Sequence, residues 1–226
     1  MASNVKNSNI VVGLDIGTSK VVCIVGKYNE HEKLEIISLG AYPSSGLKKG
    51  VVVNIDATTD AIKKAVEQAQ SMIEEKIKSV YVGIAGSHIK SLNSQGAVGI
   101  KDKEVTPYDI DRVIDSAQAV SIPSDQNVLH VLPQEYVIDN QEVSLDPLGM
   151  AGVRLEAKVH LVTCANSAVK NIEKCIKNCG LSVDGFVLEQ LASSHSILSE
   201  DEKDLGVCLV DIGGGTTDIA IFNSGS

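Results

Sequence analysis

The sequence predicts an α/β protein built from short buried strands and amphipathic helices. Hydrophobic residues make up 43% of its 226 residues and charged residues 22%, as is typical of a globular protein. Only 3% are aromatic, so the core must be built from Val, Ile, Leu and Ala, which suits buried sheets. Runs of β-branched residues alternate with segments whose apolar residues recur every three or four positions.

Charge and hydropathy exclude some functions. The net charge is −9 and there is no run of Lys and Arg, which argues against nucleic-acid binding. No apolar run reaches the roughly 18–20 residues that a bilayer span needs. The first nine residues form a short, polar segment, which argues against a signal peptide.

Five cysteines, an odd number, all lie in apolar patterns, so we expect buried thiols in a reducing cytosol. A metal site at Cys175 and Cys179, four apart on an expected helix, is the less favoured alternative. His88, His130 and His160 share no metal-type spacing and are expected in strands or at their ends.

The first part of the chain predicts three strands, a helix and a fourth strand. The strands cover residues 10–15, 21–28 and 34–42, and the short turn at residues 17–20 indicates a hairpin. Apolar residues spaced by three and four predict a helix over residues 56–77, with Asp56 as its N-cap. A strand follows over residues 80–85.

The middle predicts a mixed segment. Residues 89–100 suggest two short strands joined near Gly96. Thr106 and Pro107 begin a helix that runs to residue 120, and strands follow over residues 128–138 and 153–164. Pro133 and the two residues after it indicate a bulge or a sheet edge.

The last part predicts a helix over residues 167–179, capped by Asn166 and ended by Gly180. A strand (181–188), a short helix (189–198) and a charged, solvated connector (200–204) follow. Residues 206–211 and 217–222 form a hairpin around three glycines. Two strands alone are marginally stable, so we expect this hairpin to be disordered or packed against another chain.

One motif occurs twice. Residues 13–18 and 209–216 both consist of the end of an apolar strand, then Asp-Ile-Gly, then small residues and Thr, and a second strand follows each of them. This long-range repeat indicates a duplicated supersecondary unit. The first copy alone could be an ordinary hairpin turn, whereas three consecutive glycines in the second need a reason.

These turns suit a nucleotide triphosphate. Glycines let backbone N–H groups approach phosphate oxygens and accept the positive φ that a concave nest requires. An Asp at the strand end suits hydrated Mg²⁺, which favours one or two carboxylates plus waters. Neither a Walker A loop nor a Rossmann fingerprint fits the spacing.

The pair of turns resembles the phosphate 1 and phosphate 2 motifs of the actin, Hsp70 and sugar kinase superfamily. The resemblance implies that Asp15 and Asp211 face Mg²⁺ through waters. The segment after residue 183 is similar to the connect 1 motif, which makes Glu189 the residue that orients water or the Mg²⁺ shell, although Gln190 stands where a Pro is common. A helix N-terminal carboxylate is the alternative for Glu189. The phosphate contacts implied are Gly17, Thr18, Ser19 and Lys20 on one side and Gly213, Gly214, Gly215, Thr216 and Thr217 on the other.

Within this superfamily, three segments from residues 80–89, 128–139 and 146–163 resemble the FtsA family of bacterial cell division proteins. The resemblance runs from residue 10 to residue 222. It implies an actin-like (ribonuclease H-like) domain 1A over residues 1–84 and 165–203 and an inserted SHS2-like α+β domain 1C over residues 85–164. Residues 204–226 would begin domain 2A, leaving the second lobe truncated.

The resemblance also implies a function. The leading expectation is an ATP-binding scaffold with slow or vestigial turnover that polymerises and tethers the FtsZ ring to the cytoplasmic membrane at the division site. Domain 1C would contact neighbouring subunits and later division proteins. FtsZ contacts and a membrane-binding helix would lie outside this chain. A PilM-like pilus-assembly scaffold and an active ATPase or kinase are the alternatives.

Overall fold

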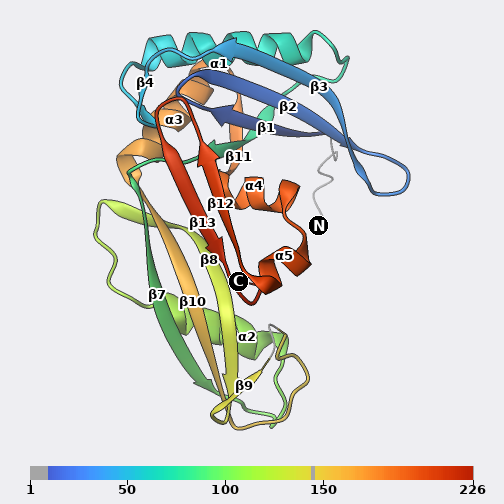
Figure 1. Ribbon diagram of the computed structural model, residues 1–226, viewed down its shortest axis with the longest axis vertical. Coiled ribbons are helices and arrows are strands. Elements are labelled where there is room, and N and C mark those ends of the chain that lie inside the picture. Colours follow the sequence, from blue (N-terminus) through green and yellow to red (C-terminus); the bar gives the residue numbers. More distant parts are fainter. Residues whose placement is uncertain (1–9, 144–145, 226) are drawn as a thin grey trace, which may run out of the picture. The chain divides into compact units, whose positions relative to one another are not determined.

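The chain is described by a computed structural model that covers residues 10–143 and 146–225. It divides into two compact units (Figure 1). Unit 1 comprises Met1–His88, Ser167–Ile197 and Leu209–Ala220, and unit 2 comprises Ile89–Asn166, Leu198–Cys208 and Ile221–Ser226. The first nine residues, which we predict not to be a signal peptide, lie outside the described residues.

Unit 1 contains a five-stranded sheet in the order β11-β6-β1-β2-β3. Strands β1 (Ile10–Ile16), β2 (Lys20–Tyr28) and β3 (Leu34–Pro43) form an antiparallel meander, as the short turns predict. Strands β6 (Ser79–Ile84) and β11 (Ser182–Leu188) extend the sheet in parallel on the other side of β1. A two-residue ladder of β4 (Leu47–Lys48) and β5 (Val51–Val52) lies apart from it.

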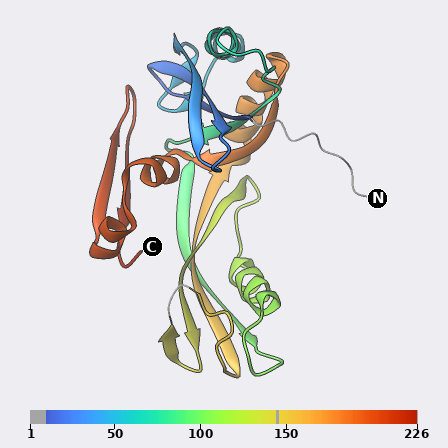
Figure 2. The ribbon, with the colours of Figure 1, turned by 90° about the vertical axis from the view of Figure 1, so that its right-hand side faces the viewer.

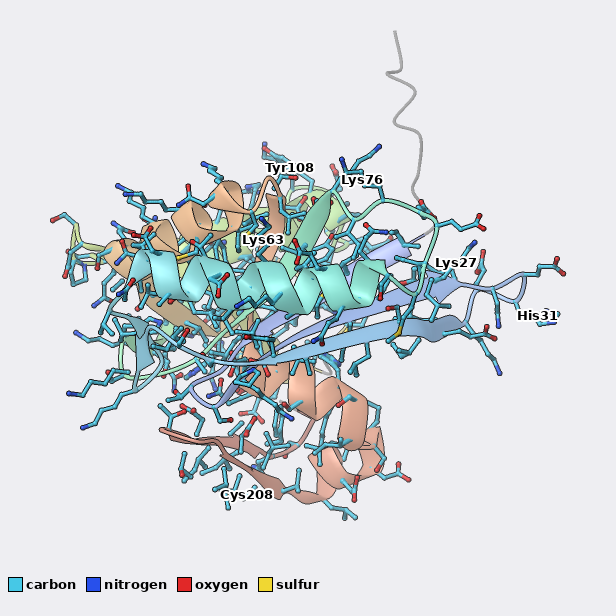
Figure 3. The ribbon with its side chains drawn as sticks, turned by 90° about the horizontal axis from the view of Figure 1, so that it is seen from above. Lys27, His31, Lys63, Lys76, Tyr108 and Cys208 are labelled. Atoms are coloured by element: carbon cyan, nitrogen blue, oxygen red, sulfur yellow. The ribbon has the colours of Figure 1, made fainter. Side chains whose placement is uncertain are left out.

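Helix α1 (Ile55–Gln70) covers one face of β2 and β3. Figure 3 shows α1 lying across these strands, with Lys63 on its outer side and Lys27 and His31 near the far end of the hairpin. The N-cap is Asn54, whose side chain accepts from the backbone N–H of Ala57, so the prediction of Asp56 was wrong. The helix ends at Gln70, before the predicted residue 77. The Gln70 side chain holds the non-helical segment that follows: its amide nitrogen donates to the carbonyl of Ile73, and its amide oxygen accepts from the backbone N–H of Ile77.

The contact between α1 and β3 is tight because a glycine lies beneath the helix. A Cβ on Gly40 would stand 2.6 Å from the backbone nitrogen of Ala69. The Ser38 hydroxyl donates to the carbonyl of the same Ala69 at 2.6 Å. The core beneath α1 is aliphatic, as the composition predicts, and includes Val12, Leu14, Val21, Ile62, Val80 and Val82.

Helix α3 (Asn166–Asn178) packs beside α1. The Cys179 thiol donates to the carbonyl of Thr59 at 3.4 Å. Gly180 follows the helix at φ +76°, the left-handed position expected of it. Cys23, Cys164 and Cys175 are buried as expected, but Cys208 is exposed, because its side chain projects from the outer face of a two-stranded hairpin.

Unit 2 is a four-stranded antiparallel sheet in the order β7-β10-β8-β9, with α2 (Pro107–Gln118) on one face (Figure 2). Strand β7 (Ile89–Gly99) is one continuous strand, so the predicted break near Gly96 was wrong. Gly96 is instead the point where α2 approaches the strand, since a Cβ there would collide with the backbone of Val113 and Ala117. Thr106 and Asp109 form the capping box that begins α2.

The remaining strands of unit 2 are β8 (Gln126–Ile138), β9 (Gln141–Val143) and β10 (Arg154–Ala165). The register between β8 and β10 shifts between Lys158 and Val159, opposite Glu135 and Pro133, which confirms the predicted bulge. The core of this unit lies between the sheet and α2 and includes Val105, Val113, Ala117, Leu155 and Leu161.

Two short helices and a hairpin complete the chain. Helix α4 (Glu189–Ile197) follows β11 as predicted, but residues 200–205 form helix α5 (Glu200–Leu205), not a connector. A capping box between Ser199 and Glu202 begins α5. Strands β12 (Val207–Ile212) and β13 (Thr217–Phe222) pair as an ordered hairpin, so the expectation of disorder was wrong. Its outer apolar side chains Val210, Ile212, Ile219 and Ile221 are exposed.

Candidate functional site

Two turns of unit 1 have the same backbone geometry. Between β1 and β2, the N–H of Gly17 donates to the carbonyl of Lys20 at 3.1 Å. Between β12 and β13, the N–H of Gly213 donates to the carbonyl of Thr216 at 2.9 Å. The sequence repeat is therefore also a structural repeat of strand, turn and strand.

The two turns lie against each other. A Cβ on Gly214 would stand 2.8 Å from the Ser19 Cβ, and a Cβ on Gly215 would stand 2.8 Å from the Thr18 Cγ2. None of the glycines in either turn has positive φ, so that part of our expectation was wrong. The lack of a side chain at Gly214 and Gly215 matters because it lets the second turn approach the first turn closely.

The predicted carboxylates converge next to these turns. Asp15 and Asp211 are the next-to-last residues of β1 and β12, and Glu189 is the first residue of α4. Burial raises the pKa of Asp15, and the charge of Asp211 raises it further, while Lys20 lowers it. Burial also raises the pKa of Glu189 to about 7, with smaller contributions from the charges of Asp15, Asp211 and Asp218. These shifts show that several acidic groups lie close together at this place, with Lys20 as a partial counter-charge.

These groups border a cleft of about 600 Å³ on the sheet face that carries Asp15. Lys20 is the cation that lines it, together with the acids Asp15, Glu189 and Asp211. The rest of the lining is largely apolar and comes from the five strands of the sheet and α4, including Val22, Ile24, Leu39, Tyr81, Val187 and Ala192. Tyr81 and Leu39 remain 45% and 48% exposed on this face.

The remaining predicted residues stand beside this cleft. Gly17, Thr18, Glu189 and Thr216 line a small adjoining cavity, and Thr217 is the first residue of β13. Gln190, which stands where the superfamily often has proline, is buried, and its Oε1 has no hydrogen-bond partner among the described residues.

Sequence reasoning missed three residues of this region. Gly83 of β6 makes room for Glu189, since a Cβ there would stand 3.0 Å from the Glu189 Cγ and 3.2 Å from its Oε1. Asp218 adds negative charge toward Glu189. His88 has both ring nitrogens buried without a hydrogen-bond partner among the described residues, and burial lowers its pKa while Asp218 raises it. Asp218 closes the second motif and could have been found there, whereas Gly83 carries no local signal.

Comparison with known proteins gives matches over nearly the whole chain. The family model "SHS2 domain inserted in FTSA" matches residues 86–163. Cell division protein FtsA of Pseudomonas aeruginosa is 62% identical over 99% of this chain and 54% of that protein. FtsA of Neisseria meningitidis serogroup B is 54% identical and FtsA of Escherichia coli K12 is 46% identical, over 94% and 96% of this chain and 51% and 52% of those proteins. The chain thus spans about half the length of the curated relatives it matches.

Solved structures share the fold at much lower identity. A structure of the PilM–PilN type IV pilus biogenesis complex matches with a TM-score of 0.66 and 16% identity, over 93% of this chain and 57% of that one. The ethanolamine utilization protein EutJ of Carboxydothermus hydrogenoformans matches with a TM-score of 0.51 and 14% identity, over 96% of this chain and 48% of that one. The fold is accordingly the predicted actin-like α/β fold with an SHS2 domain, and the chain belongs to the FtsA family of cell division proteins.

Proposed function

We propose that the two facing turns of unit 1 belong to a site for ATP and Mg²⁺. The observation that carries this proposal is the contact between the turns, next to Asp15, Asp211 and Glu189. A nucleotide triphosphate needs backbone N–H donors on both sides of its phosphates, from residues with small side chains, and its cation needs carboxylates nearby. A site of this kind works mainly by positioning and charge neutralisation.

The chemistry of the residues fits a hydrated cation. Among residues 10–143 and 146–225, no group of three or more His, Cys, Asp or Glu could hold a metal ion directly. Mg²⁺ usually keeps several waters and takes only one or two carboxylates, so Asp15 and Asp211 are proposed to hold it through water. Phosphate contacts are assigned to Gly17, Thr18, Ser19 and Lys20 on one side and to Gly213, Gly214, Gly215, Thr216 and Thr217 on the other.

Glu189 is proposed to orient the attacking water or the cation's water shell. A carboxyl with a pKa of about 7 can exchange protons near neutral pH. This observation also supports the second candidate, an active ATPase at the same site, in which Glu189 would accept a proton from water. A rapid rate of phosphate release would favour the second candidate over a scaffold with slow turnover.

The cell division role follows from the family, and its details are part of the proposal. Residues 1–84 and 165–203 are assigned to domain 1A, residues 85–164 to domain 1C and residues 204–226 to the start of domain 2A. We propose that the whole protein polymerises, tethers the FtsZ ring to the cytoplasmic membrane and recruits later division proteins through domain 1C. In the described part of the chain, no helix is long and apolar enough to span a bilayer.

Calorimetric titration with Mg-ATP tests the site. It should be run on this chain and on a longer version that reaches the length of the curated relatives, each with and without Asp211→Ala. Asp204→Ala, an exposed acid of α5, serves as the matched control. Binding by the longer version that is lost with Asp211→Ala and kept with Asp204→Ala supports the proposal. Binding that survives Asp211→Ala in a folded protein would falsify the assignment.

A further inference from the structure

Three of the four edges of the two large sheets carry a feature that hinders strand pairing. In β3 the register shifts between Ser38 and Ile36, which leaves Ile37 without a partner in β2. In β11 a similar shift leaves Asp184 unpaired, which places a charged residue at an irregularity of the edge. Strand β9 is only three residues long. Bulges, charges and short strands are the usual means of protecting an edge.

Strand β7 is neither short nor bulged, and its one charge lies near one end. It runs for eleven residues and pairs with β10 residue for residue, without a register shift. It contains no proline and a single charged residue, Lys90, at its second position. Because β7 ends the sheet order, its other edge has no strand partner among the described residues (Figure 1). A long, regular edge with few charges is a template for another strand.

We propose that the free edge of β7 pairs in antiparallel fashion with β7 of a second copy of this chain. An antiparallel pair of identical strands obeys two-fold symmetry, so residue i of one copy faces residue j of the other copy, and residue j faces residue i. The two four-stranded sheets would then form one continuous sheet.

The distribution of charge favours a second copy as the occupant. The chain has a net charge of −9, so two copies repel each other unless they meet at an uncharged surface. Charged residues make up 22% of the chain, but β7 has one in eleven. In the register centred on Ser94, Ser91 faces Ala97 of the other copy, Asn93 faces Gln95 and Lys90 faces the neutral Val98.

The pairing concerns unit 2 alone and needs no nucleotide. It goes beyond the proposed function by naming the strand through which two copies associate. Polymerisation with ATP that is insensitive to changes in β7 would leave the proposed function intact and overturn this inference. The two proposals can therefore fail separately.

Sedimentation of the chain over a range of concentrations tests the pairing. The chain as given should dimerise, and two variants should weaken the dimer, namely Gln95→Lys/Ala97→Lys and Gln95→Glu/Ala97→Glu. Both positions are exposed and lie on one face of β7. Residue 95 of one copy is a diagonal neighbour of residue 95 of the other copy, within reach of long side chains, so like charges there should weaken association at least about tenfold in each variant. An equimolar mixture of the two variants should restore dimers, because opposite charges then meet.

A control variant places the same added charge elsewhere in unit 2. Ser116→Lys/Gln141→Lys changes exposed positions on α2 and β9 and should dimerise as the unaltered chain does. Circular dichroism establishes that every variant is folded. The inference is overturned if the unaltered chain remains monomeric, if the β7 variants associate normally, or if their mixture fails to recover dimers.

Discussion

Glu189 carries a carboxyl that the fold surrounds with other acids. Burial and the charges of Asp15, Asp211 and Asp218 raise its pKa from 4.5 to about 7. The folded state therefore binds a proton that the unfolded state releases between these two values. Below pH 4.5 the proton stabilises the folded state fully, and this stabilisation is lost as the pH rises through about 7.

Glu189→Gln should remove this pH dependence, because an amide carries no charge at either pH. From about pH 5 to about pH 8, the original chain should lose up to about 3 kcal/mol of unfolding free energy relative to the variant. Chemical denaturation at the two pH values measures the difference. Glu30→Gln, at an exposed position in the turn after β2, should behave like the original chain. An equal pH dependence in all three proteins would contradict the assignment.

Gly83 and Gly13 offer a matched pair on the cleft face of the sheet. A Cβ at residue 83 would press on the Glu189 side chain, whereas a Cβ at residue 13 would meet open space. Gly83→Ala should push the carboxyl toward water and lower its pKa by about half a unit, and Gly13→Ala should leave it unchanged. Carboxyl-carbon NMR titration measures both values. A shift of equal size in both variants would count against a positioning role for Gly83.

At the scale of elements, Gly96 accounts for the incorrect prediction of two strands. A glycine in a strand pattern indicates either a turn or a close approach of another backbone, and the sequence alone does not separate the two. The structure shows a close approach to α2 at Val113 and Ala117. The same limit applies to Gly83, whose importance depends on a residue far along the chain.

Gly96→Ala should destabilise unit 2 by at least about 2 kcal/mol, because the added methyl group collides with the α2 backbone, which cannot move as a side chain can. Gly99→Ala is the control, since it lies in the same strand and a Cβ there meets nothing within 4 Å. Thermal unfolding of the two variants measures the difference. Equal melting temperatures would show that α2 does not press on β7 at this point.

Other elements show which local signals were sufficient. The Thr106 cap with Pro107 placed the start of α2 correctly, because both the cap and the proline act within one turn. Helix α5 was missed although Ser199 and Glu202 carry the capping-box spacing, because a charged run is usually a solvated loop. The two glycine turns were found because their chemistry is local, whereas their mutual contact required the folded structure.

At the scale of the whole molecule, each unit has a core of its own. Ile62 of α1 is fully buried in the core of unit 1, and Val113 of α2 is fully buried in the core of unit 2. Ile62→Ala should remove about 2–5 kcal/mol from unit 1, and Val113→Ala should remove about 1–3 kcal/mol from unit 2. Hydrogen exchange followed by mass spectrometry should show faster exchange only in the unit that carries the substitution. Uniform acceleration across both units by either substitution would contradict separate cores.

The place where the chain enters and leaves the four-stranded sheet of unit 2 has an evolutionary consequence. Ile89, the first residue of β7, pairs with Cys164, next to the last residue of β10, so the two ends of the insert are neighbours in one ladder. Because the two ends of the insert are adjacent, it can be accommodated between β6 and α3 without separating these two elements widely. Recombination that exchanged everything between these two residues would replace the inserted sheet while leaving the strand order of unit 1 unchanged.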